Sequence, residues 1–192
     1  EGIADDLIDR IRAQIENISV GDPTKRENWM GPVIHRRAYQ QFLEYSRALA
    51  QRGRVVIGGR HLEHGALACG YYCAPTLVEA DFGDPLWKTE MFLPIAMVGR
   101  FASNEEAMGL ANDSDLGLTA GVYGSAEEVA WFLDRIEAGV TYANRPQGAT
   151  TGAWPGYQAF GGWKGSGSTG KAIGSTYYLP LYLREQSQTV VD

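Results

Sequence analysis

The sequence predicts an α/β fold in which helices cover a mostly parallel sheet. Three observations support this prediction: amphipathic stretches alternate with short apolar runs, two serine caps mark helix starts, and glycines separate the elements. The 192 residues include 17 basic and 23 acidic side chains, which gives a net charge of −6. This length suffices for one domain or slightly more. The acidic balance argues against nucleic acid and membrane surfaces as partners, because both attract basic proteins.

The composition also predicts where the protein resides. No apolar run approaches the roughly 20 residues of a membrane-spanning helix, and no leading segment resembles a signal peptide. The two cysteines are too few for a disulfide framework. We therefore expect a cytoplasmic protein that does not contact membranes.

The first half of the chain is expected to contain two helices and three strands. Apolar residues at spacings of three and four form one stripe along residues 3–18, and Gly21-Asp22-Pro23 ends this helix. A second stripe predicts a helix over residues 39–49. Apolar runs predict strands at residues 55–57, at residues 71–78 with a bend at Pro75, and at residues 95–98.

Two capping boxes mark the helices of the second half. Ser103 precedes Glu106 by three residues, and Ser125 precedes Glu128 by three. Apolar runs predict strands at residues 118–123 and 140–144. Two further extended segments, residues 177–183 and 187–191, are expected near the end of the chain, and the second is expected to pair with another subunit.

Glycine is concentrated in one region. Residues 148–174 contain nine glycines together with four large aromatics, Trp154, Tyr157, Phe160 and Trp163. A flexible linker rarely carries such aromatics, so we expect an ordered surface loop whose backbone lies close to another group.

Part of this region also matches a phosphate-binding loop. Residues 165–171 (G-S-G-S-T-G-K) satisfy G-x-G-x-x-G and match a P-loop up to its lysine. A strand should precede such a loop, but residues 160–164 do not predict one. A hydroxyl should follow Lys171, but position 172 is alanine. An ATP-binding P-loop is therefore the weakest hypothesis.

The cysteines and histidines do not predict a catalytic or metal site. Cys69 and Cys73 do not form a C-x-x-C pair, and no second pair completes a zinc site. Cys73 lies in a predicted strand and is expected to be a small buried hydrophobe. We expect His35, His61 and His64 on the surface.

Seven segments, taken in order, resemble the C-terminal part of the catalytic domain of aldehyde dehydrogenases. Residues 148–153 and 182–189 are similar to the branch of that family that oxidises L-glutamate γ-semialdehyde, the 1-pyrroline-5-carboxylate dehydrogenases of proline catabolism. The seven segments are V-G-D-P at 20–23, G-P-V-I at 31–34, P-T-L at 75–77, E-M-F-L-P at 90–94, L-G-L-T-A-G at 116–121, G-V-T-Y-A-N at 139–144 and F-G-G-W-K-G-S-G at 160–167.

The resemblance implies roles for five residues. Glu90 would hold the ribose hydroxyls of NAD or NADP, and Phe92 would lie beside the nicotinamide. Gly152 and Ala153 would present backbone N–H groups to the α-carboxylate of the substrate. Phe160 would pack against the aliphatic part of the substrate.

The resemblance also implies how the chain is organised. Residues 1–175 would form a partial catalytic domain that includes the substrate loop at 145–175, and residues 176–192 would form an oligomerisation segment with a terminal strand. The sequence departs from the family pattern at two positions, since the family usually has glycine where Leu93 stands and proline where Ala159 stands.

The family's chemistry needs further parts that no segment here matches. These are a nucleophilic cysteine, a glutamate that activates water, an oxyanion-hole asparagine and a dinucleotide-binding domain. We therefore expect an oxidoreductase fragment that is inactive alone, contains no catalytic residue, and binds NAD or NADP only in the full-length protein. The expected partners are an aldehyde substrate and either other copies of the chain or the missing N-terminal part. The alternative is a non-catalytic interaction module that retains the fold.

Overall fold

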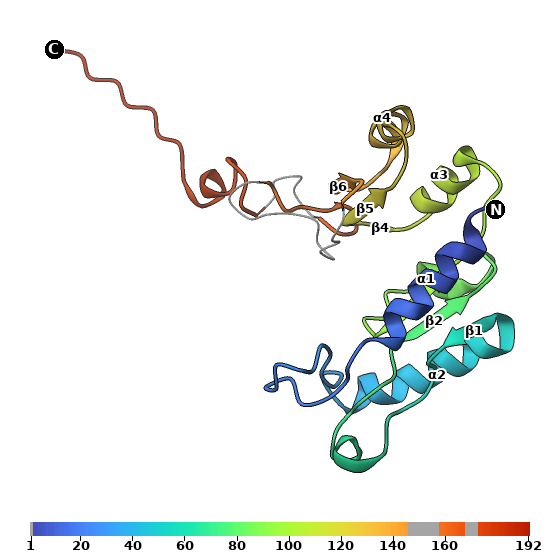
Figure 1. Ribbon diagram of the computed structural model, residues 1–192. Coiled ribbons are helices and arrows are strands. Elements are labelled where there is room, and N and C mark those ends of the chain that lie inside the picture. Colours follow the sequence, from blue (N-terminus) through green and yellow to red (C-terminus); the bar gives the residue numbers. More distant parts are fainter. Residues whose placement is uncertain (1, 146–157, 168–172) are drawn as a thin grey trace. The chain divides into compact units, whose positions relative to one another are not determined.

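Helices and strands alternate along the chain in the computed structural model, which describes residues 2–145, 158–167 and 173–192 (Figure 1). The chain divides into a first unit, Glu1–Ala102, and a second unit, Ser103–Asp192. Each unit is described by itself. The α/β class predicted from the sequence is confirmed.

Two amphipathic helices of the first unit pack against its sheet. Helix α1 (Ala4–Glu16) buries Ile8, and helix α2 (Arg36–Arg52) buries Phe42 and Leu49 completely. Both helices contact the first strand of the sheet. The predicted apolar stripe is therefore the buried face of α2, whereas in α1 Ile8 is buried but Ile3 and Leu7 at the start of the stripe are exposed.

The three strands of the first unit form one sheet in sequence order. Strand β2 pairs antiparallel with β1 and parallel with β3. Leu49 of α2 packs with Val78 and Ala80 to form the core, against partly buried side chains of β1 and β3. The strands are β1 (Arg54–Ile57), β2 (Thr76–Glu79) and β3 (Ile95–Val98).

Ion pairs at one end of this sheet join α1, β1 and β2 to Arg100, which follows β3. The carboxylate of Glu79 on β2 accepts hydrogen bonds from Arg100 and from Arg54 of β1. Arg100 also donates to Asp5 of α1 at 2.6 Å. The two guanidinium groups, Arg100 first, hold the pKa of Glu79 below its usual range.

The second unit contains two capped helices and two short sheets. Strands β5 and β6 pair in parallel, whereas β4 and β7 pair antiparallel. Met108 of α3 and Phe132 of α4 form the core with Ile136 and Ala138. The elements are α3 (Asn104–Asn112), β4 (Leu116–Gly117), β5 (Thr119–Val122), α4 (Ala126–Arg135), β6 (Val140–Ala143) and β7 (Trp163–Lys164).

Both predicted serine caps are present. The Ser103 hydroxyl accepts a hydrogen bond from the backbone N–H of Glu106. The Ser125 hydroxyl does the same for Glu128, whose carboxylate in turn accepts from the Ser125 N–H at 2.8 Å. The capping signals therefore located the starts of α3 and α4 correctly.

The sheets are mixed: β2–β3 and β5–β6 pair in parallel, as predicted, whereas β1–β2 and β4–β7 are antiparallel. A parallel connection requires a crossover, usually an α-helix. The connection from β1 to β2 instead contains a short 3₁₀ helix, Gly65–Cys69. This connection brings β2 back antiparallel to β1, whereas the connection from β2 to β3, which also contains a 3₁₀ helix (Pro85–Lys88), gives a parallel pair.

Two of the three other predicted extended segments differ from the structure. Strand β2 starts only at Thr76, after Pro75, and Cys73 before it makes one isolated bridge with His61. Residues 177–183 contain a 3₁₀ helix, Leu179–Tyr182, in which Pro180 favours the helical turn. Residues 187–191 are extended and exposed but pair with no strand among the residues described.

No helix within the described parts of the chain is long and apolar enough to span a bilayer.

Candidate functional site

The E-M-F-L-P segment lies immediately before β3 in the first unit. The backbone N–H of Thr76 donates to the Pro94 carbonyl at 2.9 Å, which ties the end of this segment to the start of β2. Phe92 has a left-handed backbone (φ 53°), and its side chain is 88% exposed. A bulky residue rarely adopts this conformation. The segment therefore holds a large aromatic ring in solvent at a conformational cost that its own packing does not offset.

The carboxylate of Glu90 is available for a ligand. Glu90 is exposed, and no described residue forms an ion pair or hydrogen bond with its side chain. A free carboxylate two residues from an exposed ring fits a ligand that combines hydroxyl groups with a flat ring. The residues present therefore fit the ribose and nicotinamide of NAD or NADP.

The third predicted site residue that the structure describes, Phe160, lies in the second unit. Phe160 is half-buried, and its backbone exchanges hydrogen bonds with Ile173 at 2.9 and 3.0 Å. The other two, Gly152 and Ala153, lie outside the described residues, as do residues 146–157 and 168–172 of the loop predicted at 145–175.

The glycines of the F-G-G-W-K-G-S-G segment pack against the chain's own backbone. A Cβ atom on Gly139 would lie 1.8 Å from the Gly161 carbonyl oxygen. A Cβ atom on Gly167 would lie 2.1 Å from the Gly162 carbonyl oxygen. Within residues 158–167 the glycines therefore allow close contact between backbone segments.

The structure also gives this segment tethers that the sequence did not reveal. The Lys164 ammonium lies 2.6 Å from the Glu137 carboxylate and donates to the Asn112 carbonyl. The Asn112 side chain binds the connection between α4 and β6, because its Oδ1 accepts a hydrogen bond from the Glu137 N–H. Lys164 stands inside a motif noted above, but its partners lie far away in sequence, so no local pattern could identify them.

The P-loop match has different surroundings from those expected. Residues 163–164 form strand β7, which the sequence did not predict. However, Gly165 donates its N–H to Asp115, and the Ser166 hydroxyl accepts from the Gly117 N–H. Residues 168–171 lie outside the described residues. The described part of the motif is thus engaged in internal hydrogen bonds.

The cysteines are poor nucleophile candidates. Cys73 is fully buried, as predicted, and burial raises the pKa of its thiol to about 12. Cys69 is exposed at the end of a 3₁₀ helix. At neutral pH the Cys73 thiol is protonated and enclosed, so it does not supply a thiolate.

The prediction of surface histidines is wrong for His61. His35 is exposed and caps α2 by accepting from the Ala38 N–H, and His64 is exposed. The ring of His61 is largely buried and stacks on Tyr39 at 3.4 Å. Within residues 2–145, 158–167 and 173–192, no three His, Cys, Asp or Glu side chains gather to hold a metal ion.

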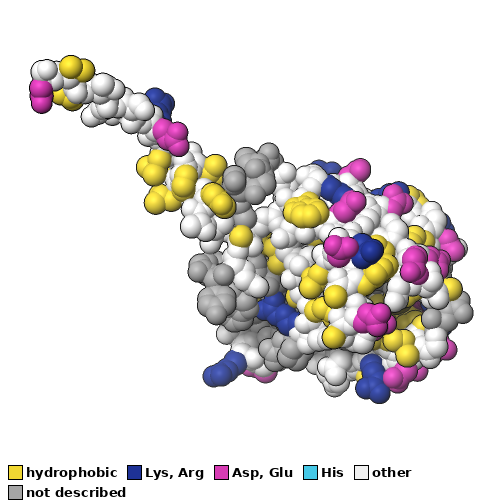
Figure 2. Space-filling model, turned by 90° about the horizontal axis from the view of Figure 1, so that it is seen from above, with side chains coloured by type: hydrophobic (Ala, Val, Ile, Leu, Met, Phe, Trp, Pro, Cys, Tyr) yellow, Lys and Arg dark blue, Asp and Glu magenta, His cyan; other side chains and the backbone are white. Residues whose placement is uncertain are grey.

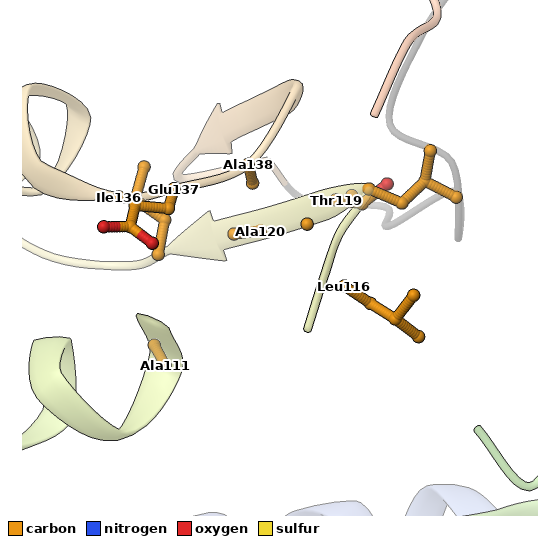
Figure 3. A pocket seen from close by; sticks show the side chains of 9 residues that line it. Ala111, Leu116, Thr119, Ala120, Ile136, Glu137 and Ala138 are labelled. Atoms are coloured by element: carbon orange, nitrogen blue, oxygen red, sulfur yellow. The ribbon is translucent and has the colours of Figure 1, made fainter. Parts of the chain in front are cut away.

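A hollow of about 290 Å³ lies between the elements of the second unit. Figure 3 shows Ala111 at the end of α3, Ile136 and Ala138 in the connection from α4 to β6, and Leu116 on the other side. Its one titratable lining residue, Glu137, is already paired with Lys164. Because Glu137 is paired, the described lining of the hollow offers no free acid or base for chemistry.

Comparison with known proteins identifies the family. The profile described as "Aldehyde dehydrogenase family" matches residues 1–187. The chain belongs to the aldehyde dehydrogenase family. The resemblance drawn from the seven segments is therefore confirmed.

Two similar curated members of the family are 1-pyrroline-5-carboxylate dehydrogenases. The chain is 33% identical over 194 residues to 1-pyrroline-5-carboxylate dehydrogenase 1 of Halalkalibacterium halodurans, covering 99% of this chain and 35% of that protein. It is 32% identical to 1-pyrroline-5-carboxylate dehydrogenase of Geobacillus kaustophilus, covering 100% of this chain and 36% of that protein. This aldehyde dehydrogenase chain thus spans about a third of the length of the curated relatives it matches.

The fold of this aldehyde dehydrogenase chain also matches a solved structure. A 1-pyrroline-5-carboxylate dehydrogenase from Thermus with bound NAD superimposes with a TM-score of 0.85 at 34% identity. The superposition covers 95% of this chain and 34% of that one.

Proposed function

We propose that the chain is part of an NAD(P)-dependent aldehyde dehydrogenase that oxidises L-glutamate γ-semialdehyde to the carboxylate. One observation carries the proposal: the E-M-F-L-P segment presents Phe92 88% exposed in a strained backbone conformation. Strain of this kind persists where function requires it. The names of the relatives support the choice of substrate.

The first unit contributes to cofactor binding in this proposal. The Glu90 carboxylate accepts hydrogen bonds from the ribose hydroxyls and thereby fixes the orientation of the attached ring. The Phe92 ring lies against one side of the nicotinamide and excludes water there. When bound, the nicotinamide supplies the acceptor for hydride.

The second unit contributes to substrate binding. The half-buried Phe160 packs against the aliphatic part of the aldehyde, and the backbone N–H groups of Gly152 and Ala153 bind its α-carboxylate. Small side chains at these two positions allow an anion to approach the backbone. The chain thus binds and orients the reactants.

The remainder of the full-length protein supplies the reacting groups. Cys73 is excluded as the nucleophile by its burial and raised pKa. The nucleophilic cysteine, the glutamate that activates water and the dinucleotide-binding domain therefore belong to the part of the protein that this chain does not span. We expect the 192 residues alone to show no aldehyde oxidation.

The full-length protein that contains this chain tests the proposal. We expect it to reduce NAD⁺ or NADP⁺ in the presence of L-glutamate γ-semialdehyde, followed by the absorbance of the reduced cofactor. The isolated 192 residues, assayed in parallel, should not. Turnover by the isolated chain would show that the groups assigned to the remainder are not needed.

Substitutions at Glu90 and Phe92 separate function from stability. In the full-length protein, Glu90→Gln should raise the KM for the cofactor about tenfold, because a charge-assisted hydrogen bond is lost. Phe92→Gly should also impair cofactor use, yet it should not lower the melting temperature, because glycine adopts a φ of 53° without strain.

Trp29→Ala is the matched control for these substitutions. Trp29 is another exposed aromatic of the first unit, 77% exposed and without an assigned role. We expect the Trp29→Ala variant to have the same kcat and the same KM values as the unmodified protein. If Phe92→Gly behaved like Trp29→Ala, Phe92 would have no part in cofactor binding.

A second candidate function is a non-catalytic interaction module, favoured by the exposed end of the chain. Figure 2 shows hydrophobic side chains gathered along the extended C-terminal segment. They include Tyr177, Leu179, Leu181, Tyr182, Leu183, Val190 and Val191, each at least half exposed. Residues 187–191 pair with no strand among the described residues, and this stretch, with the exposed side chains of Val190 and Val191, suits addition to a sheet of another subunit.

Truncation tests whether this segment mediates assembly. The chain lacking residues 176–192 should form assemblies of fewer subunits than the chain with them, as measured by size-exclusion chromatography with light scattering. Removing these residues takes away no part of the described cores, so both forms should show the same helical content by circular dichroism. An equal number of subunits in the two assemblies would contradict strand-mediated assembly.

A further inference from the structure

Lys164 has an unusual environment for a lysine in a short surface strand. Its backbone is left-handed (φ 50°), and its side chain is only 24% exposed. The ammonium lies 2.6 Å from the Glu137 carboxylate and donates to the backbone carbonyl of Asn112 at 2.5 Å. The backbone strain and the loss of side-chain conformational entropy both cost free energy, and the ion pair and hydrogen bond of the ammonium must offset this cost.

The ammonium lies where two helices end. Helix α3 ends at Asn112 and helix α4 at Arg135. The Asn112 side chain joins these ends, since its Nδ2 donates to the Arg135 carbonyl and its Oδ1 accepts from the Glu137 N–H, both at 2.9 Å. A cation is favoured beside a helix C-terminus, where the carbonyl groups carry partial negative charge. Lys164 therefore binds a rigid and electrostatically suited site.

The rest of the F-G-G-W-K-G-S-G segment is held to the same body. The Gly165 N–H donates to the Asp115 carbonyl at 2.8 Å, and the Ser166 hydroxyl accepts from the Gly117 N–H at 3.0 Å. Phe160 stands four residues before Lys164, and its own backbone is bonded to Ile173. The position of Phe160 thus depends on how firmly residues 163–166 are attached.

We propose that Lys164 is a positioning residue that fixes Phe160 for binding of the aldehyde substrate. The inference rests on the proposed function, in which Phe160 contacts the aliphatic part of the substrate. Lys164 itself does not touch the substrate. Its ion pair with Glu137 and its hydrogen bond to Asn112 restrict the segment from Phe160 to Gly167 to one arrangement, and a small displacement of a binding group weakens substrate binding strongly.

The test compares four variants of the full-length protein: Lys164→Met, Glu137→Gln, the double variant and Lys164→Arg. We expect Lys164→Met to raise the KM for L-glutamate γ-semialdehyde about tenfold, with the KM for the cofactor unchanged. Lys164→Arg retains the charge and should restore most of the loss. The double variant should have the same KM for the aldehyde as Lys164→Met, because both substitutions break the same ion pair between Lys164 and Glu137.

Hydrogen exchange measured by mass spectrometry gives a readout that does not depend on activity. Amide exchange in residues 158–167 should be faster in Lys164→Met than in the unmodified protein, and exchange in α2 should be unchanged. Arg10→Met is the matched control, since it removes one partner of the exposed ion pair with Asp6. It should change neither the exchange of residues 158–167 nor any KM.

The outcomes separate the two proposals. If the unmodified full-length protein oxidised no aldehyde, the proposed function would fail, and the exchange experiment would still decide whether Lys164 holds the segment. If the unmodified protein is active, a lower melting temperature for Lys164→Met with unchanged KM values would overturn the positioning role. Unchanged exchange in residues 158–167 would overturn it as well.

Discussion

Replacement of Gly139 by alanine is expected to lower the free energy of unfolding of the second unit by about 3 kcal/mol. The added Cβ would lie 1.8 Å from the Gly161 carbonyl oxygen and 2.6 Å from its carbonyl carbon. Both atoms belong to the backbone, so no side chain can rotate away. The F-G-G turn must therefore move off the start of β6, or β6 must shift.

The displacement should also affect the tethers of the neighbouring strands. The Gly139 N–H donates to the Gly117 carbonyl at 3.0 Å, and Gly117 in turn pairs with Trp163 of β7. We expect urea unfolding monitored by circular dichroism to show a lower midpoint. In the full-length enzyme, the proposed role of Phe160 predicts a higher KM for the aldehyde.

Gly109→Ala provides the control. Gly109 lies inside α3, and its added Cβ would meet no atom within 4 Å. Alanine in a helix interior should stabilise the protein by up to about 1 kcal/mol. The two glycine substitutions thus have opposite expected signs, and a stabilising Gly139→Ala would refute the close backbone contact.

Replacement of Arg52 by methionine is expected to destabilise the first unit by about 2 kcal/mol at neutral pH. The Asp84 side chain is only 3% exposed, and its carboxylate accepts from the Arg52 guanidinium at 2.7 and 3.0 Å. It also accepts from the Leu86 N–H at 2.9 Å and so caps a 3₁₀ helix, Pro85–Lys88. Without Arg52, the buried carboxylate keeps only that last partner. The Arg52 side chain is 45% exposed, so we place the loss below that of a fully buried pair.

The pH dependence of stability gives this prediction a sign. Arg52 above all, aided by the Leu86 N–H, holds the pKa of Asp84 below its usual value near 3.8. A carboxyl with a lowered folded-state pKa contributes stability above its unfolded pKa and loses it as the pH falls through the folded-state pKa. The unmodified protein should therefore lose stability in acid below about pH 4 more steeply than Arg52→Met does.

The measurement is urea unfolding across a pH series, with Arg12→Met as the control. Arg12 forms an exposed pair with Glu16 at 3.1 Å, and its loss should cost less than about 0.5 kcal/mol. Adding Asp84→Asn to Arg52→Met should recover part of the lost stability, because it removes the unpaired buried charge. Parallel pH profiles for Arg52→Met and the unmodified protein would contradict the assigned role of the pair.

The candidate site was predicted from the sequence to different extents. The E-M-F-L-P segment marked Glu90 and Phe92, and the structure leaves both side chains accessible to a ligand. Phe160 was predicted as a substrate contact, but its support by Lys164 was not. The partners of Lys164 include Asn112, 52 residues earlier in the chain, and no periodicity links residues so far apart.

The helices and most strand positions could be predicted from the sequence, because they depend on signals within one or two turns of chain. The apolar spacing of α2 and the Ser125–Glu128 capping box are examples. The family could be predicted because seven segments in order resemble it. Only the tertiary structure decided the direction of β1 against β2, and the reason Gly139 must be glycine. Both depend on which distant segment lies alongside, and that is set by packing of the whole unit.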